Sequence, residues 1–217
     1  MAIGDGAGSA LRSREGADVA TRAFCDAALR AMLAASGPDD WEALVLEAFK
    51  QARNAVIQYA ERESAPVRSF ATTLCGVVAT EEVLVAAQVG DGIVVVLDAE
   101  MALRLLLRPQ RGQYANEVPF LTSDGALDGL DIHVRLDRPL AFAALTDGLL
   151  HLAVQLPSYT PHEPFFLPLF ALVADSNDIV EAEQHLQRFL SSERVNARTD
   201  DDKTLVIASR RLFTQRG

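Results

Sequence analysis

The chain has 217 residues, of which 49% are hydrophobic and 23% are charged, a composition typical of one soluble globular domain over 1–217. Its formal net charge of -10 at pH 7 disfavours binding to nucleic acid or to an anionic membrane surface, because both of these partners are negatively charged. The two cysteines form no disulfide framework, and no apolar run reaches the length of a membrane span or has the pattern of a secretory signal, so we expect a cytoplasmic protein.

Two helices are expected before any strand. Small and apolar residues recur at helical spacing over 17–35 and again over 41–62, and Ser36-Gly37-Pro38 separates the two patterns. These patterns predict a pair of long helices with one buried face each.

Strand patterns dominate the middle of the chain. The predicted strands are 69–79, 83–89, 93–97, 102–107, 118–122, 132–136 and 140–145. Short polar turns between the first four predict an antiparallel meander. Since helices and strands come in separate blocks, the pattern favours an α+β layered sandwich over a doubly wound parallel sheet.

The last third mixes helix, loop and strand signals. Residues 149–156 are expected to be helical, and four prolines over 157–168 predict an irregular flap with exposed aromatic residues. A helix is predicted from 178 to 190, followed by a final strand over 204–208.

Three acidic turns are the main candidates for a functional site: Asp5-Gly6, Asp147-Gly148 and Asp201-Asp202. Each lies beside a tight turn or an apolar run that is typical of a buried strand. A fold that brings these strand ends together would gather carboxylates, which are the ligands that hard divalent cations need. This arrangement indicates metal-assisted phosphate chemistry.

Each acidic turn also has a structural interpretation. Asp147 can equally be a helix N-cap, and the acids over 200–202 can form an ordinary solvated turn. Asp91-Gly92 lies between two predicted strands with almost no loop, so a type I′ hairpin turn explains it without a function, although its acid can still face a metal site. The segment 4–8 lacks the spacing of a phosphate-binding glycine loop, and no HExxH or GxSxG motif occurs.

Six short segments follow one another along nearly the whole chain: Asp5-Gly-Ala-Gly-Ser-Ala, Ser69-Phe-Ala-Thr-Thr-Leu, Val89-Gly-Asp-Gly, Leu121-Thr-Ser-Asp, Leu145-Thr-Asp-Gly and Asp201-Asp-Lys-Thr. In this order and spacing they resemble the type 2C metal-dependent (PPM-type) protein phosphatase family, in its bacterial branch. The resemblance implies a four-layer α-β-β-α sandwich with two antiparallel sheets and a two-metal Mn²⁺ or Mg²⁺ centre at one sheet edge.

The resemblance also implies roles for single residues. Asp5 would bridge the two metals, the carbonyl of Gly6 would ligate one, and Asp147 and Asp201 would complete the other, while Asp91 matches an acid associated with a third ion. No catalytic side chain beyond these ligands is implied, because the nucleophile is an activated water. The implied substrate is a phosphoserine or phosphothreonine monoester on a protein, with a Ser/Thr kinase as the opposing partner.

The chain departs from the family in its first residues. Family members carry upstream strands with an arginine and an acidic metal ligand, and neither has a counterpart here, which predicts an unpaired sheet edge and a weakened metal site. Ala71 replaces a usual glycine, and Ala7 takes a position that is histidine in some members. Arg12 and Arg14 are interpreted as solvent-facing rather than as phosphate ligands. A catalytically impaired binding or regulatory module is therefore the alternative to a working phosphatase.

Overall fold

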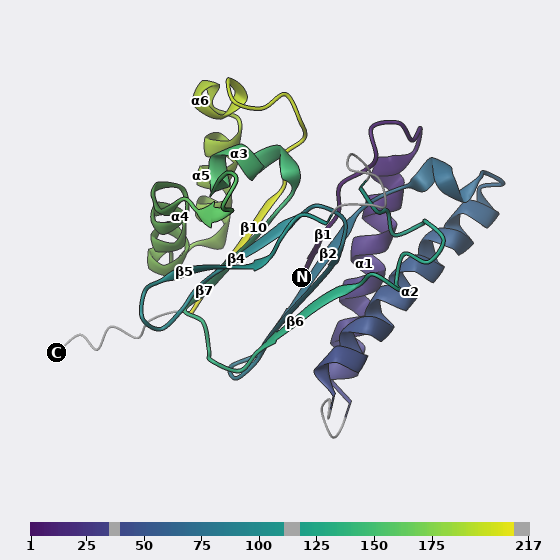
Figure 1. Cartoon of the computed structure of the whole chain (residues 1–217), viewed down its shortest axis with the longest axis horizontal. Helices are drawn as coiled ribbons and strands as arrows, with labels where there is room; N and C mark the ends of the chain where they lie inside the picture. The colour runs from purple at the N-terminus through teal and green to yellow at the C-terminus, as the bar shows by residue number, and fades with distance from the viewer. Residues whose placement is uncertain (35–39, 111–117, 211–217) are drawn as a thin grey trace.

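The computed structural model describes residues 1–34, 40–110 and 118–210. Two four-stranded antiparallel sheets pack face to face between two groups of helices (Figure 1). The first sheet has the order β1 (Ala2–Ile3), β2 (Leu74–Ala79), β3 (Leu84–Val89) and β6 (Asp131–Arg135). The second has the order β10 (Leu205–Ser209), β7 (Ala141–Leu145), β4 (Ile93–Leu97) and β5 (Leu103–Leu107). The predicted α+β sandwich of four layers is confirmed, and β1 and β10 are each one of the two edge strands of their sheet.

Alternation along the strands builds three apolar layers. In β3, Leu84 and Ala86 pack in the core between the sheets, whereas Val85 and Ala87 pack against the helices. The same alternation in β4 places Val94 and Val96 between the sheets and their neighbours on the opposite face. These strands are apolar on both faces because both faces are covered, which is why their sequences read as continuous apolar runs.

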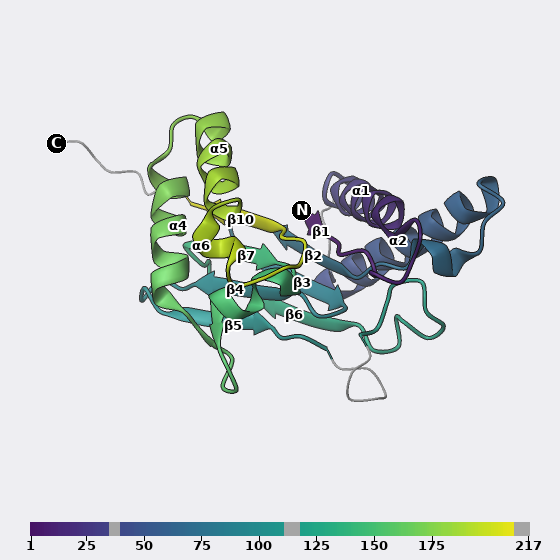
Figure 2. The ribbon, with the colours of Figure 1, turned by 90° about the horizontal axis from the view of Figure 1, so that it is seen from above.

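The first two helices cover the first sheet. They are α1 (Ser13–Met32) and α2 (Trp41–Arg62), and they lie side by side on its outer face (Figures 1 and 2). Phe24 of α1 and Phe49 of α2 meet edge to face with ring centroids 5.2 Å apart. Both predicted helices are confirmed, although α1 begins before the predicted start at 17 and ends at Met32, before the predicted end at 35.

A second group of helices covers the outer face of the second sheet (Figure 2). It contains η2 (Asp147–Leu149), α3 (Leu150–Ala153), α4 (Glu163–Asp175), α5 (Ile179–Leu190) and α6 (Glu193–Asn196). The helix predicted over 178–190 is confirmed as α5, and Asp178 caps it by accepting a hydrogen bond from the backbone N–H of Val180 at 2.8 Å.

Two predictions for this region are wrong. The helix expected over 149–156 ends at Ala153, and the chain continues into a small hairpin of β8 (Val154–Gln155) and β9 (Thr160–Pro161). The irregular flap expected over 157–168 ends where α4 begins. The adjacent rings of Phe165 and Phe166 are 6% and 0% exposed, and their burial stabilises a helix despite the proline within it.

The predicted meander is also wrong in its centre. β2 pairs with β3 and β4 pairs with β5, but β3 and β4 belong to different sheets. The turn at 90–92 therefore crosses from one sheet to the other and is not a hairpin turn. Residues 118–122, which were predicted to be a strand, form no strand in the structure. Leu121 is fully buried in the helix-covered core, and its backbone N–H donates a hydrogen bond to the Thr72 carbonyl at 2.8 Å without forming a ladder.

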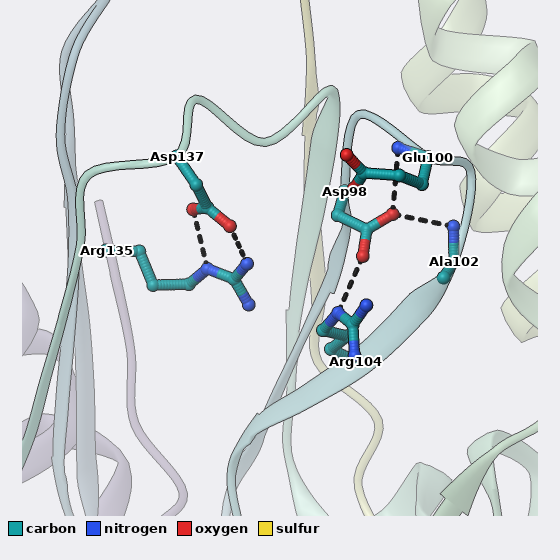
Figure 3. A network of polar contacts seen from close by, with 6 residues as sticks. All are labelled: Asp98, Glu100, Ala102, Arg104, Arg135 and Asp137. Carbon is teal, nitrogen blue, oxygen red and sulfur yellow. Dashed lines mark hydrogen bonds and ion pairs between the residues drawn. The ribbon is translucent and has the colours of Figure 1, made fainter.

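A buried carboxylate organises the β4–β5 turn at one end of the sandwich (Figure 3). Asp98 is 2% exposed and accepts hydrogen bonds from the backbone N–H groups of Glu100 at 3.1 Å and Ala102 at 2.8 Å, and from Nε of Arg104 at 2.6 Å. These bonds compensate its burial.

None of the described helices is long and apolar enough to cross a membrane.

Candidate metal centre

Strand register places the predicted acidic turns at one end of the sandwich. In the first sheet Ile3 pairs with Cys75 and Leu74 pairs with Val89, so the chain leaves β1 toward Asp5 at the end where it leaves β3 toward Asp91.

The second sheet has its acids at the same end. Leu145 pairs with both Ile93 and Leu205, so Asp147 follows β7 where Asp201 precedes β10. The turn at 90–92 joins β3 directly to β4 at this end, which links the two sheets there. Asp98 lies at the opposite end of β4.

The Asp5 loop is held to the residues that precede β2. The Asp5 carbonyl accepts hydrogen bonds from the backbone N–H of Thr73 at 2.8 Å and from Oγ1 of Thr72 at 2.9 Å, and the Asp5 backbone N–H donates to Oγ1 of Thr73 at 3.0 Å. Gly6 forms a bridge with Thr72, and the Ala7 backbone N–H donates to the Ala71 carbonyl at 2.9 Å. The backbone on both sides of the Asp5 carboxylate is therefore fixed.

The Asp147 turn is held to the segment before β10. The Thr146 backbone N–H donates to the Thr204 carbonyl at 3.2 Å, and Oγ1 of Thr146 accepts from the Thr204 backbone N–H at 3.1 Å. A Cβ atom at Gly148 would lie 2.1 Å from the carbonyl oxygen of Asp202. Only glycine permits this approach, which places Asp147 beside the 201–202 turn.

Two of the acids, Asp5 and Asp91, have a raised pKa. Burial, followed by the neighbouring Asp147 and then Asp201, raises the pKa of Asp5 to about 7. Burial and then the charge of Asp147 raise the pKa of Asp91 to about 6. The causes of these shifts place the four carboxylates in one electrostatic environment.

Asp147 carries the clearest sign of an unmet ligand. Its Oδ1 is buried and has no hydrogen-bond partner among the described groups, and neither the η2 nor the α3 N-terminus has a side-chain cap. The interpretation of Asp147 as an N-cap is therefore wrong. A buried carboxylate oxygen without a donor is destabilising unless a cation compensates it.

Asp201 is more exposed than the other acids. Its Oδ1 accepts a hydrogen bond from the Asp202 backbone N–H at 2.9 Å, as expected for a solvated turn, while its charge still acts on Asp5 and Asp91. Within the described ranges, no three His, Cys, Asp or Glu side chains stand close enough together to hold one metal ion as they are. The donor types fit Mn²⁺ or Mg²⁺, and the fold brings them to one place without assembling a complete ligand set.

Arg12 has a structural role and is half-buried, so its interpretation as a solvent-facing residue is wrong. Its guanidinium pairs with Glu15 and, at 2.8 Å, with Glu63, and it lies 4.7 Å from the ring centroid of Phe70. Arg14 is exposed. Neither observation makes these arginines phosphate ligands.

Sequence reasoning missed the polar groups behind the acids. Thr72 and Thr73 belong to a motif of the family resemblance, but the motif does not predict that they hold the Asp5 loop by hydrogen bonds. Gln88 is fully buried, and its Oε1 has no partner among the described groups and would lie 3.5 Å from a Cβ at Gly92, beside Asp91. A lone glutamine within an otherwise apolar strand was the available signal.

Comparisons with known proteins give two matches at the level of sequence. A family model described as Protein phosphatase 2C matches residues 1–191. Serine/threonine-protein phosphatase 3 of Escherichia coli (strain K12) is 36% identical over 209 residues, covering 95% of this chain and 81% of that protein.

Solved structures share the fold at lower identity. The serine/threonine phosphatase Stp1 from Staphylococcus aureus superimposes with a TM-score of 0.63 at 14% identity, covering 96% of this chain and 82% of that one. The serine/threonine phosphatase PstP/Ppp of Mycobacterium tuberculosis gives a TM-score of 0.61 at 16% identity, covering 96% and 86%. The family match and the E. coli relative together show that this chain belongs to the protein phosphatase 2C family of enzymes.

Proposed function

We propose that the chain is a metal-dependent serine/threonine protein phosphatase whose Mn²⁺ or Mg²⁺ ions are held by Asp5, the Gly6 carbonyl, Asp147 and Asp201, with Asp91 available to a third ion. The observation that carries this proposal is the buried Oδ1 of Asp147, which has no hydrogen-bond partner among the described residues and lies at the strand ends where the other acids converge. Divalent cations would neutralise this charge and supply that oxygen with a partner.

The chain's own residues would position the reaction. Bound divalent cations supply a water of lowered pKa and compensate the charge on the phosphoryl oxygens. Thr73 fixes the Asp5 loop, and Gly148 allows the Asp147 turn to approach Asp202. These contacts fix the backbone behind the carboxylates, so that ion binding would require only the carboxylate side chains to move together.

The substrate class follows from the family and its members. The E. coli relative and the two structural neighbours are named as serine/threonine phosphatases. We extend this class to the present chain, so phosphoserine and phosphothreonine in proteins would be hydrolysed, with a Ser/Thr kinase supplying the substrate. A cytoplasmic location is part of the same proposal.

A phosphatase-like binding module is the alternative. It is favoured by the absence, among the described residues, of three acids close enough together to hold an ion as they stand. Such a module would bind a phosphoprotein without releasing phosphate.

Phosphate release from phosphopeptides separates the two proposals. The full chain, with Mn²⁺ or Mg²⁺, should hydrolyse phosphoserine and phosphothreonine peptides in preference to a phosphotyrosine peptide of the same sequence. EDTA should stop the reaction, and returning the metal should restore it. Binding of the peptides without metal-dependent phosphate release would favour the module.

A further inference from the structure

Two cavities lie among the helices that cover the second sheet. The first has a volume of about 190 Å³ and is walled by Leu152 of α3, Phe165 and Leu169 of α4 and Phe189 of α5, with Arg194 and Arg198 at α6 and just after it. The second, of about 370 Å³, shares Leu152, His162 and Arg198 with the first. The shared residues make the two cavities neighbours, and together they are called the depression.

The depression combines an apolar floor with a cationic rim. Phe165 and Leu169 are buried in its wall, whereas Arg194 and Arg198 are exposed. In the described part of the chain, no carboxylate lies within ion-pair distance of either guanidinium. Neither cavity is lined by Asp or Glu.

The positive charge of the rim contrasts with the net negative charge of the chain. The chain carries 30 acidic and 20 basic side chains, yet this depression presents two arginines and no acid. A ligand with an apolar group beside a carboxylate would match both the floor and the rim.

The depression is close to the acids in the chain. Arg198 precedes Asp201 by three residues, which span at most roughly 11 Å when fully extended. On the other side, His151 lines the second cavity four residues after Asp147. Figure 1 shows α3 and α6 at the same end of the molecule as the segment that leads into β10. An extended peptide rises about 3.3 Å per residue, so three residues cover the distance from Asp201 to Arg198, and one or two more would reach the apolar floor behind Arg198.

We propose that this depression binds the phosphoprotein substrate itself, by taking an apolar residue next to an Asp or Glu that lies three to five residues from the phosphorylated residue. The apolar side chain enters the pocket between α3, α4 and α5, and its neighbouring carboxylate pairs with Arg194 and Arg198. The inference rests on the proposed phosphatase function and adds a sequence preference to it.

Charge reversal tests this preference. Phosphothreonine peptides carry Leu-Glu, Leu-Lys or Ala-Glu at three, four or five residues on either side of the phosphothreonine. Hydrolysis of p-nitrophenyl phosphate, which is too short to reach the cavities, is measured for each variant, and each peptide kcat/KM is divided by that value. The variants are Arg194→Glu/Arg198→Glu and, as a matched control, Arg188→Glu, which is exposed on α5 and lines neither cavity.

The wild-type chain should prefer Leu-Glu over both other peptides by roughly tenfold at one spacing, as expected for the loss of one charge-assisted contact or one buried side chain. The double variant should favour Leu-Lys over Leu-Glu, whereas Arg188→Glu should keep the wild-type order. Equal kcat/KM for the three peptides, or the same reversal in Arg188→Glu, would overturn the proposal.

Failure of the phosphatase function would be distinguishable. If the wild-type chain hydrolyses neither p-nitrophenyl phosphate nor any peptide, the proposed function is contradicted, and the cavities are then tested by fluorescence anisotropy of labelled peptides. Tighter binding of Leu-Glu that is lost in the double variant would support the site, and equal binding of all peptides would overturn it.

Discussion

Asp5 and Thr73 are joined by a reciprocal pair of hydrogen bonds: the Thr73 backbone N–H donates to the Asp5 carbonyl at 2.8 Å, and the Asp5 backbone N–H donates to the Thr73 hydroxyl at 3.0 Å. The Thr73 hydroxyl is thus the only part of this pair that a substitution can remove. It links the Asp5 loop of the candidate metal centre to the start of β2.

Thr73→Val should weaken metal binding without unfolding the protein. Valine keeps the shape but leaves the Asp5 backbone N–H without its acceptor, so the Asp5 loop loses its register. Affinity for Mn²⁺, measured by calorimetry, should fall roughly tenfold or more, as for other groups that orient metal ligands. Thr21→Val is the control, because that hydroxyl bonds back to the Ala17 and Asp18 carbonyls within α1. Unchanged affinity in Thr73→Val would show that the pair does not position Asp5.

Gly148→Ala should separate the Asp147 turn from the turn that contains Asp202. The added Cβ would lie 2.1 Å from the Asp202 carbonyl oxygen, and one of the two backbone segments must move. We expect a loss of about 1–3 kcal/mol in the free energy of unfolding, measured in urea, together with weaker metal binding. Gly8→Ala is the matched control, since a Cβ at that position meets no atom within 4 Å. Equal effects of the two alanines would contradict this account.

The metal-free protein should lose stability as pH rises. The pKa of Asp5 is raised from 3.8 to about 7, so the folded state holds its proton more tightly than the unfolded state does. The penalty is absent below about pH 4, grows as the pH rises toward 7 and is complete above it. In EDTA, Tm should therefore be higher at pH 5 than at pH 7.5.

Asp5→Asn isolates this effect. The amide removes one charge from the cluster, so metal-free Tm at pH 7.5 should rise and its dependence on pH should flatten, while stabilisation by Mn²⁺ should be lost. Asp26→Asn, an exposed position on α1, should leave both properties as in the wild type. A lower metal-free Tm in Asp5→Asn would show that the acids do not repel one another in the folded state.

Asp98 should matter for stability and not for the reaction. It is 2% exposed and holds the β4–β5 turn through two backbone N–H groups and Arg104, at the end of β4 far from Asp91. Asp98→Asn should lower Tm more than Asp137→Asn, whose ion pair with Arg135 is on the surface. Turnover per folded molecule should be unchanged in both variants, and a selective loss of turnover in Asp98→Asn would contradict this assignment.

The periodic elements were predictable because their signals are local. The helical spacing that begins near Ala17 and at Trp41 matches α1 and α2, and the apolar run at 140–145 matches β7. The pairing of strands was not predictable in the same way. Gly90-Asp91-Gly92 has the sequence of a hairpin turn, but packing of the two apolar faces of β3 and β4 places these strands in different sheets.

The candidate site was predictable in its acids and not in its supports. Asp5, Asp147 and Asp201 lie in recognisable turns, and their order along the chain carried the family resemblance. That they meet depends on strand register, which no short segment encodes. Phe165 and Phe166 were misjudged for the same reason, since four nearby prolines indicated a loop while burial against the second sheet stabilised a helix.

The most direct test of the central claim is Mn²⁺-dependent hydrolysis of p-nitrophenyl phosphate by the wild-type chain, Asp147→Asn and the surface control Asp26→Asn. If the converging acids form a working metal centre, the wild type and Asp26→Asn will hydrolyse p-nitrophenyl phosphate only when Mn²⁺ is present. Asp147→Asn will lose most or all of this activity while circular dichroism shows that it remains folded. Equal activity in Asp147→Asn, or no metal-dependent activity in a folded wild-type protein, would contradict the claim.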